Sequence, residues 1–235
     1  MVLVCAVISA MIVAAGNGLS SNANPQGHAV PFQSGYLSCC DASEVGASWV
    51  VPRLLPPAAT SVGREAAWIG AQTGSSFFVQ IGTIEEHAER GSTYEAFWSD
   101  LQVSELPITI PHALRPGDEV LAVLRREPTR WVAQLRDVTR RWTFTRRIPS
   151  SAAAQLGEWL DEDIVATALG PPTEQDQVLP MLPTDRALRF RHLTLDGLPP
   201  GQLTASGFID DTGHALVPVR DGGGDGFTVV RRAGA

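Results

Sequence analysis

Short apolar segments, each bounded by a turn, follow one another along most of this 235-residue chain. Strands are predicted at 48–54, 66–71, 76–84, 94–101, 107–110, 119–127, 130–139, 141–148, 157–164, 187–195, 202–210, 214–219 and 226–232. Glycine, proline and aspartate mark turns at 115–118, 196–201, 210–213 and 221–226. Strands this frequent, with almost no amphipathic helical segment, predict an antiparallel β-sandwich or barrel.

One segment leaves the choice between helix and strand open. Residues 151–156, Ser-Ala-Ala-Ala-Gln-Leu, favour a helix by intrinsic propensity, and such a helix could include Glu158. The alternative is a strand that begins near Gly157. The proline-rich segment from Gly170 to Asp185 is predicted to be a long surface loop. We find no internal repeat and no second domain boundary, so residues 24–235 are predicted to form one domain.

The composition agrees with a folded domain and argues against one class of partner. Hydrophobic residues make up 44% of the chain and charged residues 18%, which suffices for a sizeable core and is too little charge for disorder. The net charge is −7, so nucleic acid is not expected as a partner. All 18 basic residues are arginine. Those between Arg125 and Arg147 are interleaved with apolar residues, which predicts a solvated hairpin face.

The first residues are predicted to lie outside the folded domain. Val2 to Ala15 is an almost unbroken apolar run, which has the length of a signal-peptide core and is short for a membrane span. No Lys or Arg precedes it, which departs from the usual signal peptide. We expect residues 1–23 to be an export segment, either cleaved or kept as an anchor. The protein is therefore expected to be secreted or to reside in the cell envelope.

The cysteines do not form a disulfide framework. Cys5 lies in the export segment, and its removal leaves only the adjacent Cys39 and Cys40. This pair can form a strained vicinal bridge, stay reduced, or pair between chains. A domain of this size does not depend on disulfides for its stability.

Two short segments combine a polar side chain with apolar neighbours. Gln80 lies in the middle of the run Phe77–Thr83, and Glu158 lies beside a tryptophan in Gly157–Leu160. Burying an amide or a carboxylate is costly without partners, so the two together suggest a site. If both segments are strands of one sheet, Gln80 shares a face with Phe78 and Gly82, and the two polar side chains can converge on one face.

The wider sequence around these segments is similar to one family. Trp68-Ile69-Gly70, Val79 to Thr83, Tyr94 to Trp98 and Glu158-Trp159-Leu160 resemble, in order and approximate spacing, the glutamic peptidases, or eqolisins, of the bacterial type. The segments 35–36, 47–52 and 115–118 extend the resemblance. It implies an all-β, two-sheet antiparallel β-sandwich of the concanavalin-like jelly-roll type. It also favours a strand over a helix at Glu158.

The resemblance further implies an endopeptidase that works in acid without metal or other cofactor, with Gln80 and Glu158 as catalytic residues. A carboxylate with a pKa of about 4.3 still acts as a general base in mildly acidic solution, where histidine is protonated. An amide does not titrate, so glutamine can donate a hydrogen bond to an oxyanion at any pH. Glu158 would activate water and Gln80 would stabilise the tetrahedral intermediate.

The resemblance also suggests substrate contacts and shows departures from the family pattern. Trp68, Tyr94 and Trp98 are candidates to line the cleft, with packing in the core as the equal alternative. Phe97 replaces the usual second tryptophan, and Ser99 stands where many members carry an acidic residue. The expected partner is a polypeptide substrate, and the expected state is a monomer with no membrane attachment beyond the N-terminal segment.

Other functions compete with this hypothesis. A carbohydrate-active or carbohydrate-binding jelly roll is one, because Glu158 and Glu162 share a strand face, although the apolar Leu160 between them is unfavourable. A secreted binding domain without activity is another. Asp211-Thr212-Gly213, a tripeptide of pepsin-like peptidases, occurs once and is predicted to be a hairpin turn. The histidines have no metal-ligand spacing and are predicted to lie at the surface or in loops: 28, 87, 112, 192 and 214.

Overall fold

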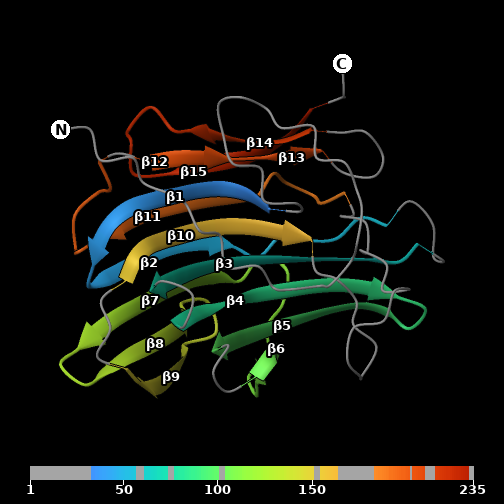
Figure 1. Ribbon diagram of the computed structural model, residues 1–235. Coiled ribbons are helices and arrows are strands. Elements are labelled where there is room, and N and C mark those ends of the chain that lie inside the picture. The colour runs from blue at the N-terminus through green and yellow to red at the C-terminus, as the bar shows by residue number, and fades with distance from the viewer. Residues whose placement is uncertain are drawn as a thin grey trace, which may run out of the picture.

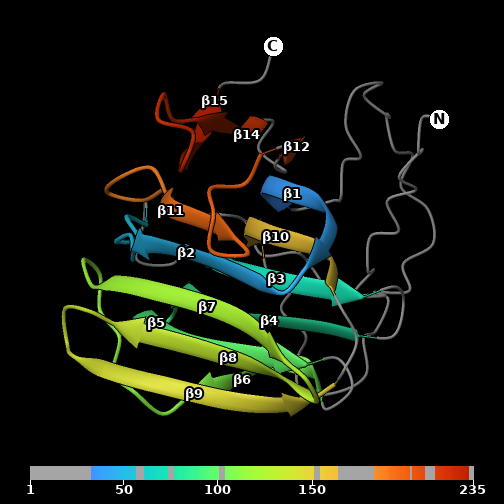
Figure 2. The same ribbon diagram turned by 90° about the vertical axis from the view of Figure 1, so that its left-hand side faces the viewer.

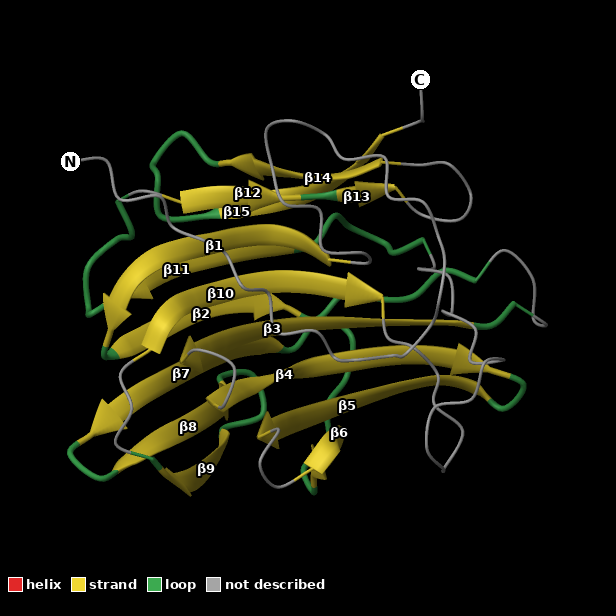
Figure 3. Cartoon of the chain, viewed as in Figure 1, coloured by secondary structure: helices red, strands yellow, loops and turns green. Residues whose placement is uncertain are grey.

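The computed structural model describes residues 33–56, 61–73, 77–100, 104–150, 154–163, 183–201, 203–209 and 215–232. These residues form fifteen β-strands and no helix (Figure 1 and Figure 3). The strands are β1 (Gln33–Ala42), β2 (Glu44–Val50), β3 (Gly63–Thr73), β4 (Phe77–Ala88), β5 (Gly91–Asp100), β6 (Ser104–Ile110), β7 (Glu119–Glu127), β8 (Arg130–Asp137), β9 (Trp142–Pro149), β10 (Ala154–Asp163), β11 (Arg189–Leu195), β12 (Leu203–Ser206), β13 (Phe208–Ile209), β14 (Ala215–Arg220) and β15 (Phe227–Arg232). Within this part of the chain, no helix is long and apolar enough to cross a membrane.

The strands form two antiparallel sheets that pack face to face. The seven-stranded sheet has the order β12-β1-β10-β3-β4-β5-β6, and the eight-stranded sheet has the order β13-β14-β15-β11-β2-β7-β8-β9. Figure 2 shows the two layers, with β7, β8 and β9 in one and β3, β4 and β5 in the other. The predicted all-β antiparallel sandwich is confirmed.

Large aromatic residues fill the space between the sheets, and two of them bridge it with hydrogen bonds. Trp49, Trp131, Trp159, Phe190 and Phe227 are at most 1% exposed. The Trp49 indole donates to Thr83 Oγ1 at 3.1 Å, and the Trp159 indole donates to the Gly46 carbonyl at 2.9 Å. A buried indole N–H without a partner would be destabilising, so these bonds fix how the sheets stack.

The first strand is missed by the sequence pattern. β1 begins at Gln33, whereas the strand prediction begins at residue 48, and β2 ends at Val50 rather than at 54. β1 lacks alternating large apolar residues because serines take buried positions: Ser34 is 0% and Ser38 is 1% exposed. Ser38 Oγ accepts a hydrogen bond from the Gly157 amide of β10 at 3.0 Å. The small buried serines therefore explain why the apolar pattern did not predict β1.

The segment that favoured a helix by propensity is a strand. β10 begins at Ala154 and pairs with β1 on one side and β3 on the other, while residues 151–153 lie outside the described part. Tertiary pairing on both edges overrides the weak preference of alanine for a helix. Glu158 therefore belongs to a central strand, as the family resemblance suggests.

The predicted turns that fall among the described residues are present. Gly117 has φ +88° in the 115–118 turn, where the Arg115 amide donates to Asp118 Oδ2 at 2.7 Å. Segments 196–201 and 221–226 are also turns or loops. The 210–213 turn with Asp211-Thr212-Gly213, the export segment 1–23 and all but the end of the 170–185 loop lie outside the described residues.

Two predictions about polar residues have opposite outcomes. Of the arginines in the 125–147 region, Arg125, Arg136 and Arg147 occupy a solvated face on β7, β8 and β9, whereas Arg126 is half-buried and Arg146 lies over the Trp98 ring. His87, in contrast, is not at the surface: it lies in β4, is 7% exposed, and its Nδ1 is 2.8 Å from Ser92 Oγ. The continuation of β4 past residue 84 carries it into the interior.

Candidate active site

Gln80 and Glu158 lie in one row of the seven-stranded sheet. Gln80 on β4 is in register with Gly70 on β3, and Gly70 is in register with Glu158 on β10. Paired residues of an antiparallel ladder share a face, so these backbone positions lie on the same face with one glycine between them. Two strand spacings put the Cα positions of Gln80 and Glu158 about 10 Å apart.

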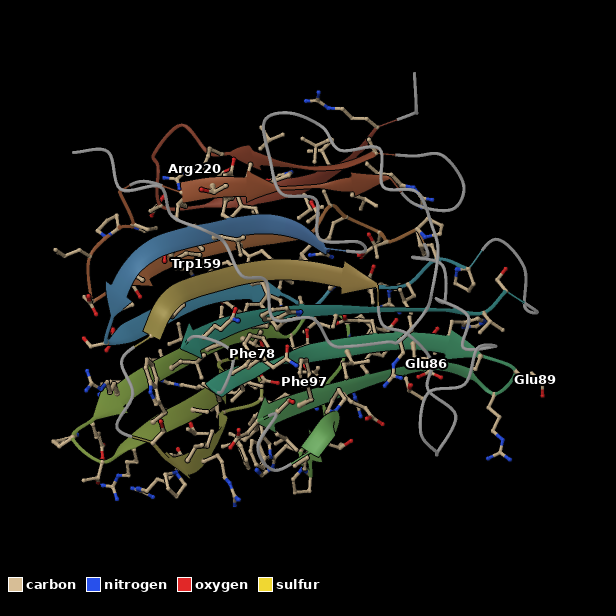
Figure 4. The ribbon with its side chains drawn as sticks, viewed as in Figure 1. Phe78, Glu86, Glu89, Phe97, Trp159 and Arg220 are labelled. Carbon is tan, nitrogen blue, oxygen red and sulfur yellow. The ribbon has the colours of Figure 1, made fainter. Side chains whose placement is uncertain are left out.

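This face is the outer one, turned away from the second sheet. Val79 and Ile81, which flank Gln80, belong to the core between the sheets. Phe78 alternates with them and belongs to a separate apolar cluster with Leu37, Ala66, Trp68, Ile84 and Phe97. Gln80 has the same strand parity as Phe78 and is 5% exposed. The row therefore crosses a buried, largely aromatic outer face, with Phe78 and Phe97 on neighbouring strands (Figure 4).

Glycines keep this face flat where the row crosses it. Gly70 places no side chain between Gln80 and Glu158. At Gly82, a Cβ atom would lie 2.2 Å from the Ala67 carbonyl oxygen and 2.6 Å from Trp68 Cβ. Only glycine leaves room for Trp68 at that point. The Trp68 ring then packs edge-on against Phe78, with 5.6 Å between centroids.

Trp159 explains why glutamate is followed by tryptophan at the site. Its indole is fully buried between the sheets and is held by the Gly46 carbonyl. Because strand residues alternate between faces, an anchor at 159 turns position 158 to the outer face. The preceding Gly157 is also constrained, since a Cβ there would lie 3.0 Å from Ser38 Oγ and from Val45 Cγ2.

The candidate substrate residues divide between the two faces. Trp68 lies on the outer face, in the row next to Gln80, paired with Gly82. Tyr94 and Trp98 have the opposite parity and pack with the core between the sheets. The Leu54 amide donates to the Tyr94 hydroxyl at 3.1 Å, and the Arg146 guanidinium lies 4.6 Å from the Trp98 ring. Of the three, only Trp68 shares a face with Gln80, and the core alternative holds for Tyr94 and Trp98.

Strand periodicity in the sequence already places Phe78 on the face of Gln80, but it does not place Phe97 or Ser99 there. Those two follow once the pairing partners are known, because Ser99 is paired with Gln80 and Phe97 with Gly82. Within the described ranges, no cluster of three or more His, Cys, Asp or Glu residues is arranged to hold a metal ion.

Comparison with solved structures shows the same fold in glutamic peptidases. A scytalido-glutamic peptidase with a transition state analog inhibitor superposes with a TM-score of 0.67 at 17% identity, covering 85% of this chain and 98% of that one. SCP-B, an eqolisin in a complex with the tripeptide Ala-Ile-His, has a TM-score of 0.58 at 17% identity over 85% and 98%. Aspergilloglutamic peptidase from Aspergillus niger has 0.54 at 16% identity over 72% and 99%.

Sequence comparison adds no relatives to these structures. No protein-family model and no curated protein matches the chain. This chain has the eqolisin fold.

Proposed function

We propose that this chain is a glutamic-type endopeptidase that cleaves polypeptides in acid, with Glu158 as general base and acid and Gln80 as oxyanion donor. The observation that carries the proposal is the row in which Gln80, Gly70 and Glu158 follow one another on one face. A non-titrating amide and a carboxylate at that separation can bracket one peptide bond and one water molecule.

The proposed reaction needs only these two side chains and water. The Glu158 carboxylate takes a proton from water while the water oxygen bonds to the scissile carbonyl carbon. Gln80 Nε2–H donates to the oxyanion of the tetrahedral intermediate. Glu158 then returns the proton to the leaving nitrogen as the carbon–nitrogen bond breaks. The general base must be ionised and the leaving amine protonated, which both occur in mildly acidic solution.

Trp68, Phe78 and Phe97 form an apolar patch beside Gln80, and each is at most 6% exposed. Two structural neighbours were solved with a transition state analog and with a tripeptide. We propose the same class of ligand, an extended peptide, for this outer face.

Acid proteolysis by two variants tests the proposal. The purified protein is expected to cleave acid-unfolded casein between pH 2 and 7, and Glu158→Gln is expected to abolish cleavage because it removes the general base. Gln80→Ala is expected to reduce kcat by about 10²–10³-fold, the usual effect of losing an oxyanion donor. Arg136→Gln, on the exposed face of the other sheet, is the matched control and should leave the rate unchanged.

The same preparation separates the peptidase from its rivals. Glu158 and Glu162 are four residues apart on one face of β10, and the apolar Leu160 between them is unfavourable for a glycosidase carboxyl pair. Cleavage of a β-glucan that depends on both carboxylates would nevertheless favour the glycosidase. Inactivity on casein and on glucan would favour a binding domain.

Export is the second part of the proposal. We propose that residues 1–23 direct the chain out of the cytoplasm and that the remaining domain acts as a monomer. N-terminal sequencing of protein recovered from culture medium should give a chain that starts near residue 24. An intact Met1 on protein confined to the cytoplasm would contradict export.

A further inference from the structure

Ser99 is a buried polar residue that the proposed reaction does not use. It lies on β5, is 0% exposed, and is paired in register with Gln80 on β4. Its hydroxyl has no hydrogen-bond partner among the described residues. A buried hydroxyl without a partner lowers stability, so a serine in this position calls for an explanation other than packing.

The pairing places the Ser99 hydroxyl beside the Gln80 amide. Directly paired residues on one face have their Cβ atoms about 4.5–5.5 Å apart. A rotation about the side-chain bonds of Ser99 or Gln80 brings the hydroxyl within hydrogen-bond distance of the amide.

A glutamine that acts as a donor needs a partner for its carbonyl oxygen. The two ends of an amide have nearly the same shape, so only hydrogen bonds decide which end faces the substrate. Gly70, on the other side of Gln80 in the row, has no side chain that could supply such a partner. Ser99 is thus the polar side chain in the row that can orient the amide from the β5 side.

We propose that Ser99 is a positioning residue: its hydroxyl donates to Gln80 Oε1 and so turns Nε2–H toward the site of the oxyanion. The proposal rests on the proposed function of Gln80 as oxyanion donor. Without the hydroxyl, the amide populates both orientations, and the one with Oε1 toward the oxyanion repels it. A mispositioned group of this kind reduces the chemical step more than it reduces substrate binding.

Ser34 provides a matched control in the same sheet. It lies on β1, is 0% exposed, and its hydroxyl also has no partner among the described residues. Ser34 is paired with Asp161, and its strand parity is that of the core residue Tyr36. Ser34→Ala therefore makes the same chemical change at the same burial, on the opposite face and outside the Gln80 row.

The kinetic test compares Ser99→Ala with Ser34→Ala on a peptide substrate in acid. We expect Ser99→Ala to lower kcat about 10–100-fold with KM changed little, because the Gln80 amide loses the partner that orients it. Ser34→Ala should raise or preserve the midpoint and preserve kcat. Ser99→Thr, which keeps the hydroxyl, should recover most of the rate. A wild-type kcat in Ser99→Ala, or equal losses in both alanine variants, would overturn the proposal.

A second measurement separates this proposal from the proposed function. The side-chain NH₂ resonances of ¹⁵N-labelled Gln80, assigned with Gln80→Ala, should shift in Ser99→Ala and not in Ser34→Ala. If wild-type protein cleaves no peptide, the proposed function fails, and this shift still reports whether Ser99 holds the amide. Resonances that stay unchanged in Ser99→Ala would overturn the role of Ser99 even in an active enzyme.

Discussion

The outer faces of the two sheets differ although both are turned away from the common core. On the eight-stranded sheet, Arg125, Arg136 and Arg147 are exposed. On the seven-stranded sheet, Trp68 and Phe97 are 1% and 2% exposed and surround Gln80. One outer face is an ordinary solvated surface, and the other is as apolar as an interior.

This difference supports the choice of face for the proposed site. An antiparallel sheet in a sandwich needs only one apolar face, and its other face is usually polar. The inner face of the seven-stranded sheet already supplies Ile69, Val79 and Ile81 to the core. The second apolar face is therefore not required to close the sandwich. Its aromatic residues, its glycines and its polar row agree with the site that we propose there.

The largest expected effect comes from removing an aromatic residue from the outer face of the seven-stranded sheet. Trp68→Ala is expected to lower the free energy of unfolding by about 3–5 kcal/mol, the usual cost of deleting a buried tryptophan. Arg136→Ala on the other outer face should change it by no more than about 0.5 kcal/mol. Denaturant unfolding of both variants measures the contrast. Equal effects would mean that the outer faces do not differ in packing.

A smaller effect is expected from filling the glycine beneath Trp68. Gly82→Ala puts a Cβ 2.2 Å from a backbone oxygen and should cost about 1–3 kcal/mol through overpacking. Gly201→Ala is the control, because nothing lies within 4 Å of its Cβ. Thermal unfolding compares the two. A Gly82→Ala protein as stable as the wild type would show that the outer face is loosely packed at this point.

The smallest effect concerns pH and the eight-stranded sheet. Burial raises the pKa of Asp137 above its ordinary value of 3.8, and the nearby Asp118 carboxylate raises it further, against hydrogen bonding from Arg140. The folded state thus holds this proton more tightly than the unfolded state. Stability falls as pH rises from 3.8 to the folded pKa, and the penalty is complete above it.

Asp137→Asn removes this penalty because the amide is neutral at every pH. The variant is expected to be more stable than the wild type at pH 7. Each kcal/mol gained in the free energy of unfolding should raise Tm by about 2–4 °C for a chain of this size. Below pH 3.8 the two proteins should be nearly equally stable. Melting curves at both pH values test this, and a variant less stable than wild type at pH 7 would contradict the sign.

Local periodicity by itself determined most of the strands. The bounds of β7 match the prediction, and β8 and β9 differ from it by two residues or fewer at each end. Residues 120–124 of β7 form an unbroken apolar run, and Trp142 and Phe144 of β9 alternate with threonine. The sequence also identified Gln80 and Glu158 as candidates, because an amide and a carboxylate within apolar strands are unusual in any fold.

Only the tertiary structure decided how those strands are combined. Strand periodicity assigns alternate residues to opposite faces but does not say which face is the core. Pairing with β10 on one side and β4 on the other put Gly70 between the two proposed catalytic residues and Ser99 beside Gln80. Strand pairing also directs Tyr94 and Trp98 toward the core between the sheets. The buried serines of β1 depend on neighbours in other strands, so no local apolar pattern predicts this strand. Such contacts join residues distant in sequence, so short-range propensity does not contain them.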